Sequence, residues 1–196
     1  SDGNVYRTVT IGSQVWMVEN LKTTKFQNGE YIQNIKDDGQ WQNCTSAAYC
    51  DIQNQPSLSE EYGRLYNGYT LYDSRNIAPK GWHVPTDKDW NELLEYLGSL
   101  AGYKLKEAGN EHWQDNFGAI ITYNSSGFTA LPAGFRNNNG LFISLTQDAC
   151  FWISNSKKSV VNQGSNNENL NYKYNDVSKE NIHMLNEGLS IRCVKD

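Results

Sequence analysis

The chain has 196 residues, a formal net charge of −5, and an unusually aromatic apolar content with 12 Tyr and 6 Trp. This length suits one domain, which we predict over residues 1–196. Because Lys and Arg are scattered singly, nothing indicates a nucleic-acid partner. No apolar run approaches the roughly 18–20 residues of a membrane span. The aromatic, Asn-rich and Gly-rich composition favours β-structure with long polar loops.

The four cysteines are Cys44, Cys50, Cys150 and Cys193. The C-x5-C spacing of the first two fits neither a zinc site nor a thioredoxin-like motif. An even count in a Tyr- and Asn-rich chain favours disulfides and an oxidising compartment over buried thiols, and 3 pairings remain open.

The predicted elements begin with a β-hairpin. Residues 5–11 alternate, with Val5, Val9 and Ile11 on one face, and Gly12-Ser13 turns the chain into residues 14–18. Residues 26–60 are polar and broken by turn residues, which predicts a long excursion with short strands. Residues 62–72 alternate and predict a strand.

One principal helix is predicted over residues 87–97. Its apolar residues fall at i, i+3, i+4 and i+7, which makes a single stripe of Trp90, Leu93, Leu94 and Leu97. Gly98 is a natural C-terminal stop. A shorter helical piece is predicted near residues 103–108.

The later part of the chain again predicts strands. Residues 128–135 and 141–145 flank the turn 137–140, and residues 149–154 form a compact apolar strand. Residues 155–169 are predicted to be an exposed loop, followed by strands near 170–174 and 189–194. The whole pattern predicts an α+β fold with antiparallel sheets.

The stretch APKGWHVPTDKDW has a structural and a functional interpretation. His83, Asp87 and Asp89 could act as ligands or acid/base groups, with Trp82 and Trp90 as a sugar platform. Alternatively, Thr86 and Asp89 have the spacing of a capping box and the aspartates complement the helix dipole. The second interpretation assigns every polar residue of the motif and is favoured.

Other catalytic signals are weak. His83, His112 and His183 show no metal-ligand spacing, and no nucleophile elbow or phosphate loop is present. The turn at Asp37-Asp38-Gly39 could hold calcium but lacks EF-hand spacing, so a plain turn is favoured. Trp41 and Trp113 lie in polar loops and could stack on sugars, although core positions are the commoner role of such side chains.

Six blocks occur in this order: GNVYRTVTIGSQVWMVENLKTT, YGRLYNGYTLY, APKGWHVPTDKDW, SGFTALPAGFR, FWIS and GLSIRCVKD. Together they resemble the Fibrobacter succinogenes major paralogous domain over residues 3–196. Such domains are abundant in secreted and surface-anchored proteins of Bacteroidota and Fibrobacterota. The family is distantly similar to formylglycine-generating enzymes and C-type lectin-like domains, through Pro85-Thr86 to Trp90 and Gly188 to Cys193. Departures occur after Trp152, where W-S-S-T is usual, and at Gly68, where an aromatic residue is usual.

The resemblance implies a C-type lectin-like fold whose ligand face corresponds to residues 136–149 and 155–169. It also implies disulfides Cys50–Cys193 and Cys44–Cys150, since Cys50 and Cys193 match family cysteines. The ligand-contact residues that we expect on this face are Arg136, Asn138, Phe142, Trp152, Asn155 and Lys157.

We therefore expect a non-catalytic binding or adhesion module that is secreted or displayed on the cell surface, with a glycan or a surface protein as its partner. The N-terminal residues contain no signal peptide, so export would require one that has been removed. No cofactor is expected, because the calcium motifs of C-type lectins are absent. The alternatives are a structural or tip subunit of a surface fibre and an enzyme of the formylglycine-generating type.

Overall fold

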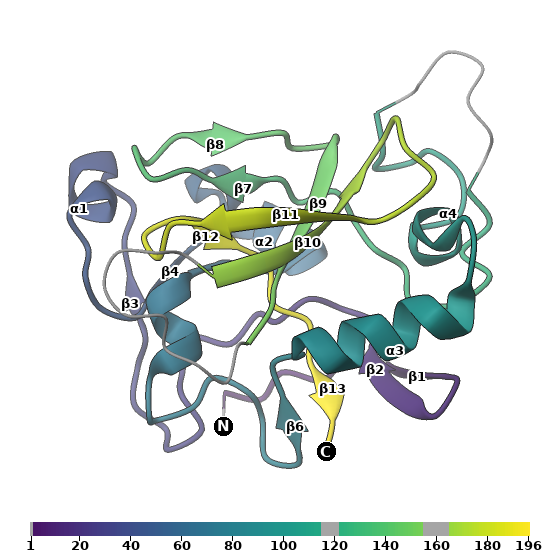
Figure 1. The fold of residues 1–196 in the computed structure, drawn as a ribbon. Helices are drawn as coiled ribbons and strands as arrows, with labels where there is room; N and C mark the ends of the chain where they lie inside the picture. Colours follow the sequence, from purple (N-terminus) through teal and green to yellow (C-terminus); the bar gives the residue numbers. More distant parts are fainter. Residues whose placement is uncertain (1, 115–121, 155–164) are drawn as a thin grey trace.

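The computed structural model describes residues 2–114, 122–154 and 165–196. The strands form three β-sheets, with α1 and α4 at opposite sides of the molecule and α3 beside β1 and β2 (Figure 1). The predicted α+β class is therefore confirmed. The helices are α1 (Asp38–Gln42), α2 (Pro56–Tyr62), α3 (Asp87–Leu97) and α4 (Ala101–Leu105), with 3-10 helices η1 (Ile52–Asn54) and η2 (Gly68–Tyr72). The strands are β1 (Thr8–Ile11), β2 (Gln14–Met17), β3 (Gln33–Asn34), β4 (Ala48–Cys50), β5 (Leu65–Asn67), β6 (Trp82–His83), β7 (Phe135–Arg136), β8 (Phe142–Ile143), β9 (Asp148–Trp152), β10 (Ser165–Asn171), β11 (Ser178–His183), β12 (Gly188–Leu189) and β13 (Val194–Lys195).

The first sheet has the order β1-β2-β13-β6 and brings the two ends of the chain together. The predicted hairpin is present, and Ile11 pairs with Gln14 across the two-residue link. Gly12 adopts a φ of +61°, which glycine tolerates without strain. Val194 pairs with Trp16 on one side and with His83 on the other, so β13 lies between the hairpin and β6.

The second sheet has the order β3-β4-β5-β12-β7-β8, and the third has the order β11-β10-β9. The predicted turn between β7 and β8 is confirmed, because Asn137 Oδ1 accepts hydrogen bonds from the backbone N–H groups of Asn139 and Leu141 at 3.0 and 2.9 Å. The third sheet joins the second at β9, where the backbone N–H of Trp152 donates to the Ser190 carbonyl at 3.0 Å.

Helix α3 begins and ends where the sequence predicts. The Thr86 hydroxyl accepts a hydrogen bond from the Asp89 N–H at 3.3 Å, and the Asp89 carboxylate accepts one from the Thr86 N–H at 2.7 Å. This reciprocal pair is the predicted capping box. Gly98 closes the helix with a φ of +65°.

The core under α3 is aromatic. Trp90 lies against Trp16, Phe128 and Phe151, with ring centroids 5.2 to 5.8 Å apart. Aromatic pairs at such distances contribute about 0.5–1.5 kcal/mol each beyond their buried area. Trp41 and Trp113 are 0% and 6% exposed, so both belong to the core and neither offers a ring to a ligand.

Several sequence predictions were wrong in detail. The strand predicted over 128–135 is present only at its last residue, which begins β7, and the helix predicted near 103–108 is α4, at Ala101–Leu105. The predicted plain turn at Asp37-Asp38-Gly39 is the capped start of α1.

Other predicted elements differ in their bounds. Val5 precedes β1 and is 91% exposed. Pro56 does not break the chain but starts α2, because a proline fits the first turn of a helix. The predicted strand over 62–72 is shorter, since η2 follows β5 at Gly68, where a Cβ would lie 2.9 Å from Leu185 Cδ2. Within the predicted loop 155–169, residues 165–169 belong to β10, the middle strand of its sheet, so the polar Asn167 is buried.

Candidate functional site

A groove of about 420 Å³ lies between the N-terminal segment and the chain that leads into β6. Its lining combines apolar surface with amide, hydroxyl and charged groups from four separate stretches of sequence. The lining residues are Asp2, Asn4, Val5, Tyr6, Met17, Thr23, Lys25, Gln27, Ile77, Ala78, Pro79, Lys80 and Trp82. Figure 1 shows the N-terminal segment near β6, at the same end of the molecule as β13.

The N-terminal wall of the groove is held by Asp2. Its carboxylate accepts hydrogen bonds from the Thr23 hydroxyl and the Thr24 backbone N–H, both at 2.8 Å. Partial burial alone would raise the pKa of this carboxyl group, but the hydrogen bonds from Thr24, Thr23 and Asn4 outweigh it and lower the pKa. Asp2 is therefore held in its charged form as a fixed acceptor.

Tyr6 continues this wall. Its hydroxyl oxygen accepts a hydrogen bond from the Lys22 backbone N–H at 2.9 Å. Burial raises the pKa of Tyr6 above its usual value, so the phenol stays neutral. The ring packs against a core cluster that includes Met17, Tyr66 and Trp152, and it offers the groove a rigid apolar face.

The opposite wall is the turn that leads into β6. The Gln27 side chain donates to the Ala78 carbonyl at 3.2 Å, and its backbone N–H donates to the Asn76 carbonyl at 2.8 Å. The Trp82 backbone N–H closes the turn on the Pro79 carbonyl at 3.0 Å. These bonds fix the half-buried Trp82 side chain at the groove.

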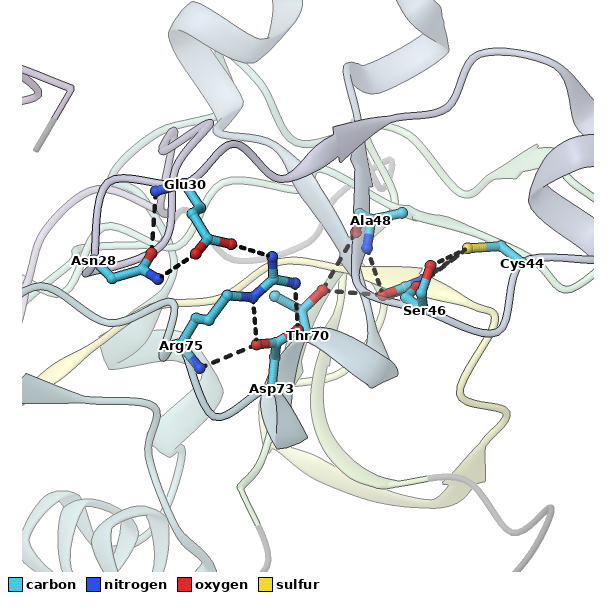
Figure 2. A network of polar contacts seen from close by, with 9 residues as sticks. Asn28, Glu30, Cys44, Ser46, Ala48, Thr70, Asp73 and Arg75 are labelled. Carbon is cyan, nitrogen blue, oxygen red and sulfur yellow. Dashed lines mark hydrogen bonds and ion pairs between the residues drawn. The ribbon is translucent and has the colours of Figure 1, made fainter.

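An ion-pair network links the two segments beside this wall, the turn at residues 26–30 and the segment before Ile77 (Figure 2). Arg75 binds Asp73 through two nitrogens at 2.8 and 2.7 Å and reaches Glu30 at 2.8 Å. Asn28 in turn donates to Glu30 at 3.0 Å. The guanidinium also lies 4.0 Å from the centre of the Phe26 ring. The network joins the turn at residues 26–30 to the segment before Ile77, so the groove is built on rigid supports.

The sequence-predicted contact residues lie elsewhere. Arg136 and Trp152 are both 0% exposed, so neither reaches a surface ligand. Arg136 donates to the carbonyls of Gly140, Ile35 and Lys36 at 2.7 to 2.9 Å and to Asp38 at 2.7 Å. It is a buried cross-link between loops rather than a contact residue.

Trp152 is likewise structural, because its indole N–H donates to the Tyr66 carbonyl at 2.7 Å within the core. Asn138 and Phe142 are half-buried, and the Phe142 ring covers the Arg136 guanidinium at 4.9 Å. Asn155 and Lys157 lie outside the described residues. The predicted ligand face is therefore not assembled by the described residues of the set.

The disulfide prediction was wrong. All four cysteines lie in the described part of the chain, and no disulfide joins any of them. Cys44 and Cys50 belong to one core cluster, whereas Cys150 and Cys193 belong to another. The Cys44 thiol instead donates to the Ser46 carbonyl at 3.1 Å (Figure 2). Burial raises the pKa of Cys50 to about 12, so this thiol is packed as a neutral apolar group.

His83 is a structural link. Its ring nitrogens lie 2.8 Å from an Asp196 carboxylate oxygen and 3.2 Å from one of Asp89. It therefore connects the start of α3 to the end of the chain, next to β13. This agrees with the structural interpretation of the motif, except that Trp82 faces the groove.

Sequence reasoning missed the groove for a specific reason. The structural interpretation of the motif places the whole stretch in a helix start and the core, but Pro79, Lys80 and Trp82 precede that helix. The other wall comes from residues 2–6 and 23–27, which lie more than fifty positions away in the sequence. Hydrophobic periodicity is a local pattern and does not predict contacts between segments so far apart.

In the described ranges, no helix combines the length and apolar character that a bilayer crossing requires. Searches of curated proteins and of solved structures found no match to the chain. The model of one protein family matches residues 9–195, which include both sides of the turn at 78–82 and nearly all of the elements described above. The chain therefore belongs to the Fibrobacter succinogenes major domain family.

Proposed function

We propose that the chain is a non-catalytic binding module of the cell exterior, and that the groove holds one unit of a glycan. The observation that carries the proposal is the combination of the Trp82 and Tyr6 rings with amide and hydroxyl groups in one groove of about 420 Å³. Small-molecule sites commonly have volumes of roughly 300–1,000 Å³ and combine apolar surface with a few placed polar groups.

The charges at the groove narrow the ligand class. Lys25 and Lys80 line it, and Lys80 is exposed at its rim. The single lining carboxylate, Asp2, already accepts several hydrogen bonds from the protein. An acidic sugar, with a carboxylate or sulfate group, would therefore gain more than a neutral one from binding here.

The same proposal includes a distant relation to the C-type lectin-like fold. Two features support it: β2 and β13 pair, which places both end regions in one sheet, and α3 packs on the core beneath that sheet. The secreted or surface location rests on the abundance of such domains in secreted and surface-anchored proteins.

A second candidate is a structural subunit of a surface fibre. It is favoured by β8, an edge strand of the six-stranded sheet, whose neighbourhood exposes Leu141 at 54% and Ile143 at 37%. Exposed edge strands with apolar side chains can pair with another chain. The formylglycine-type enzyme gains no comparable support, because Cys193 is fully buried and burial raises the pKa of its thiol above the usual value.

A glycan array that includes acidic sugars tests the proposal, followed by titration of any hit against variants. Trp82→Ala and Lys80→Glu are expected to weaken binding at least tenfold, about 1.4 kcal/mol. Lys88→Glu is the matched control, since Lys88 is exposed on α3 and lies outside the groove. Thermal unfolding of each variant separates loss of the site from loss of the fold.

Two results would contradict the proposal: an array without hits, or a hit whose affinity is unchanged in both groove variants. Sedimentation at high concentration addresses the fibre candidate. Self-association that Ile143→Lys abolishes, in a protein that binds no glycan, would favour that candidate instead.

A further inference from the structure

A second cluster of polar side chains lies outside the groove, where α2 meets the loop after α4. One donor atom from each of Glu107, Glu111 and His112 lies within 4.8 Å of the other two. The cluster differs from an ordinary acidic patch because it contains an imidazole, and imidazole with carboxylates is a common ligand set for zinc.

The fold brings these residues together through one backbone carbonyl. The Ala130 oxygen accepts hydrogen bonds from the Glu107 backbone N–H at 3.1 Å and from the Trp113 indole N–H at 3.0 Å. Because both ends of the loop 107–113 meet at this atom, Glu107 and His112 face each other. Trp113 is 6% exposed, so the loop is anchored in the core.

Glu61 on α2 orients the imidazole from its other side. The His112 Nε2 atom lies 2.7 Å from a Glu61 carboxylate oxygen, while Nδ1 lies 2.8 Å from Glu107. The Tyr62 ring stands edge-on to the imidazole, with ring centroids 5.3 Å apart. A carboxylate that accepts the N–H of one ring nitrogen orients the ring, so that the other nitrogen, here Nδ1 beside the Glu107 carboxylate, can ligate a metal together with that carboxylate.

The charge balance also favours a cation. Glu61, Glu107 and Glu111 bring three carboxylates to the cluster, and among the described residues no Lys or Arg forms an ion pair with any of them. Lys106 is close in sequence, but its ammonium group is directed to the carbonyls of Asn171 and Tyr174 at 2.5 and 2.7 Å. One histidine cannot neutralise three carboxylates.

We propose that Glu107, Glu111 and His112 bind a divalent cation of the zinc class, with His112 ligating through Nδ1 and Glu61 holding Nε2–H. Glu61 is then a positioning residue. Zinc ligands about 2 Å from the ion lie roughly 3.3 Å from one another. The three donor atoms lie up to 4.8 Å apart in the structure. Because Glu111 is exposed, its side chain can move closer to the other two ligands, and an ion can enter from solvent.

The site would fasten the loop 107–113 to α2. These two elements are separated by more than forty residues in the chain, and in the described residues the Glu61–His112 pair links them by a side-chain ion pair. The proposed role is structural, because both nitrogens of the imidazole are engaged and no reacting group adjoins them.

Zinc binding by the untagged chain, measured by calorimetry and by competition with a chromogenic chelator, tests the proposal. We expect one equivalent per chain. Glu111→Gln should abolish it, and because the Glu111 side chain is exposed this variant keeps the fold. Glu61→Gln should weaken affinity about 10–100-fold, as the loss of an orienting partner does.

Two controls distinguish this site from other zinc ligands. His83→Gln is matched, since His83 also lies between two carboxylates, Asp89 and Asp196, but outside the cluster. Cys44→Ser removes a half-buried thiol. Both variants should bind zinc normally. Absence of binding, or binding that survives Glu111→Gln and His112→Ala, would overturn the proposal, the latter outcome indicating an adventitious ion only.

Discussion

The Arg136 guanidinium lies 4.6 Å from the centre of the Trp41 ring, and both side chains are 0% exposed. The Phe142 ring lies on the same guanidinium at 4.9 Å. A cation stacked on aromatic faces and bonded to carbonyls on all its nitrogens is a pre-organised structural element. Arg136 and Phe142, which the sequence suggests as ligand contacts, thus stabilise the loops of the second sheet.

Arg136→Lys should destabilise the protein strongly. Three different nitrogens of the guanidinium donate to the carbonyls of Ile35, Lys36 and Gly140, and lysine has only one nitrogen. Each buried acceptor left unpaired costs roughly 1–3 kcal/mol. We expect a loss on the order of 3 kcal/mol in the free energy of unfolding, measured by denaturant titration. Arg7→Lys, at an exposed residue paired with Glu19, should change it by less than about 0.5 kcal/mol. Equal effects at the two positions would contradict the structural role of Arg136.

All four cysteines should react with a thiol reagent. In denaturant without reductant, a thiol reagent should detect all four cysteines of the chain. In the native protein we expect Cys44 to react first, because burial raises the pKa values of Cys50 and Cys193 and excludes the reagent. Cys44→Ser should remove the fast phase. Detection of only two thiols in the denatured chain would contradict this prediction and indicate a disulfide.

Asp89→Asn should weaken the start of α3. Loss of a capping interaction costs about 1 kcal/mol. Although partial burial raises the pKa of Asp89, hydrogen bonds from Thr86 and His83 outweigh it, so the folded-state pKa lies below the usual 3.8. The stabilisation is therefore complete above pH 3.8 and is lost as the pH falls through the folded-state pKa.

The difference in unfolding free energy between Asp89→Asn and the parent should accordingly be constant near neutral pH and shrink in acid. Denaturant titrations across pH 2–7 measure it. Glu95→Gln, at an exposed position of the same helix, is the control and should show no such trend. A difference that persists unchanged at the lowest pH would show that the carboxylate charge is not responsible.

Asp2→Asn should loosen the N-terminal wall of the groove. The amide retains one oxygen but lacks the charge that strengthens the bonds from Thr23 and Thr24. Hydrogen exchange at the Thr24 amide should become faster, with little change at the amides of α3. Unchanged protection at Thr24 would indicate that Asp2 does not secure this segment.

Local patterns predicted the elements that depend on near neighbours. The Gly12-Ser13 hairpin, the turn after Arg136, and α3 with its capping box all follow from residues a few positions apart. The pattern does not predict α2, because a proline among polar residues indicates a break in the chain as readily as the start of a helix. The strand predicted near 170–174 overlaps only the end of β10, because the buried residues 167–169 are polar and lack the apolar alternation that marks most strands.

The sequence by itself determined the class, the principal helix and, through six ordered motifs, the family. Tertiary structure alone decided which side chains are available to a ligand. Arg136 and Trp152 became core because β7 and β9 are covered by other elements, while Asp2 and Trp82 came to line one groove. Burial and the meeting of distant segments depend on how sheets pack, and a linear pattern of residues does not carry that information.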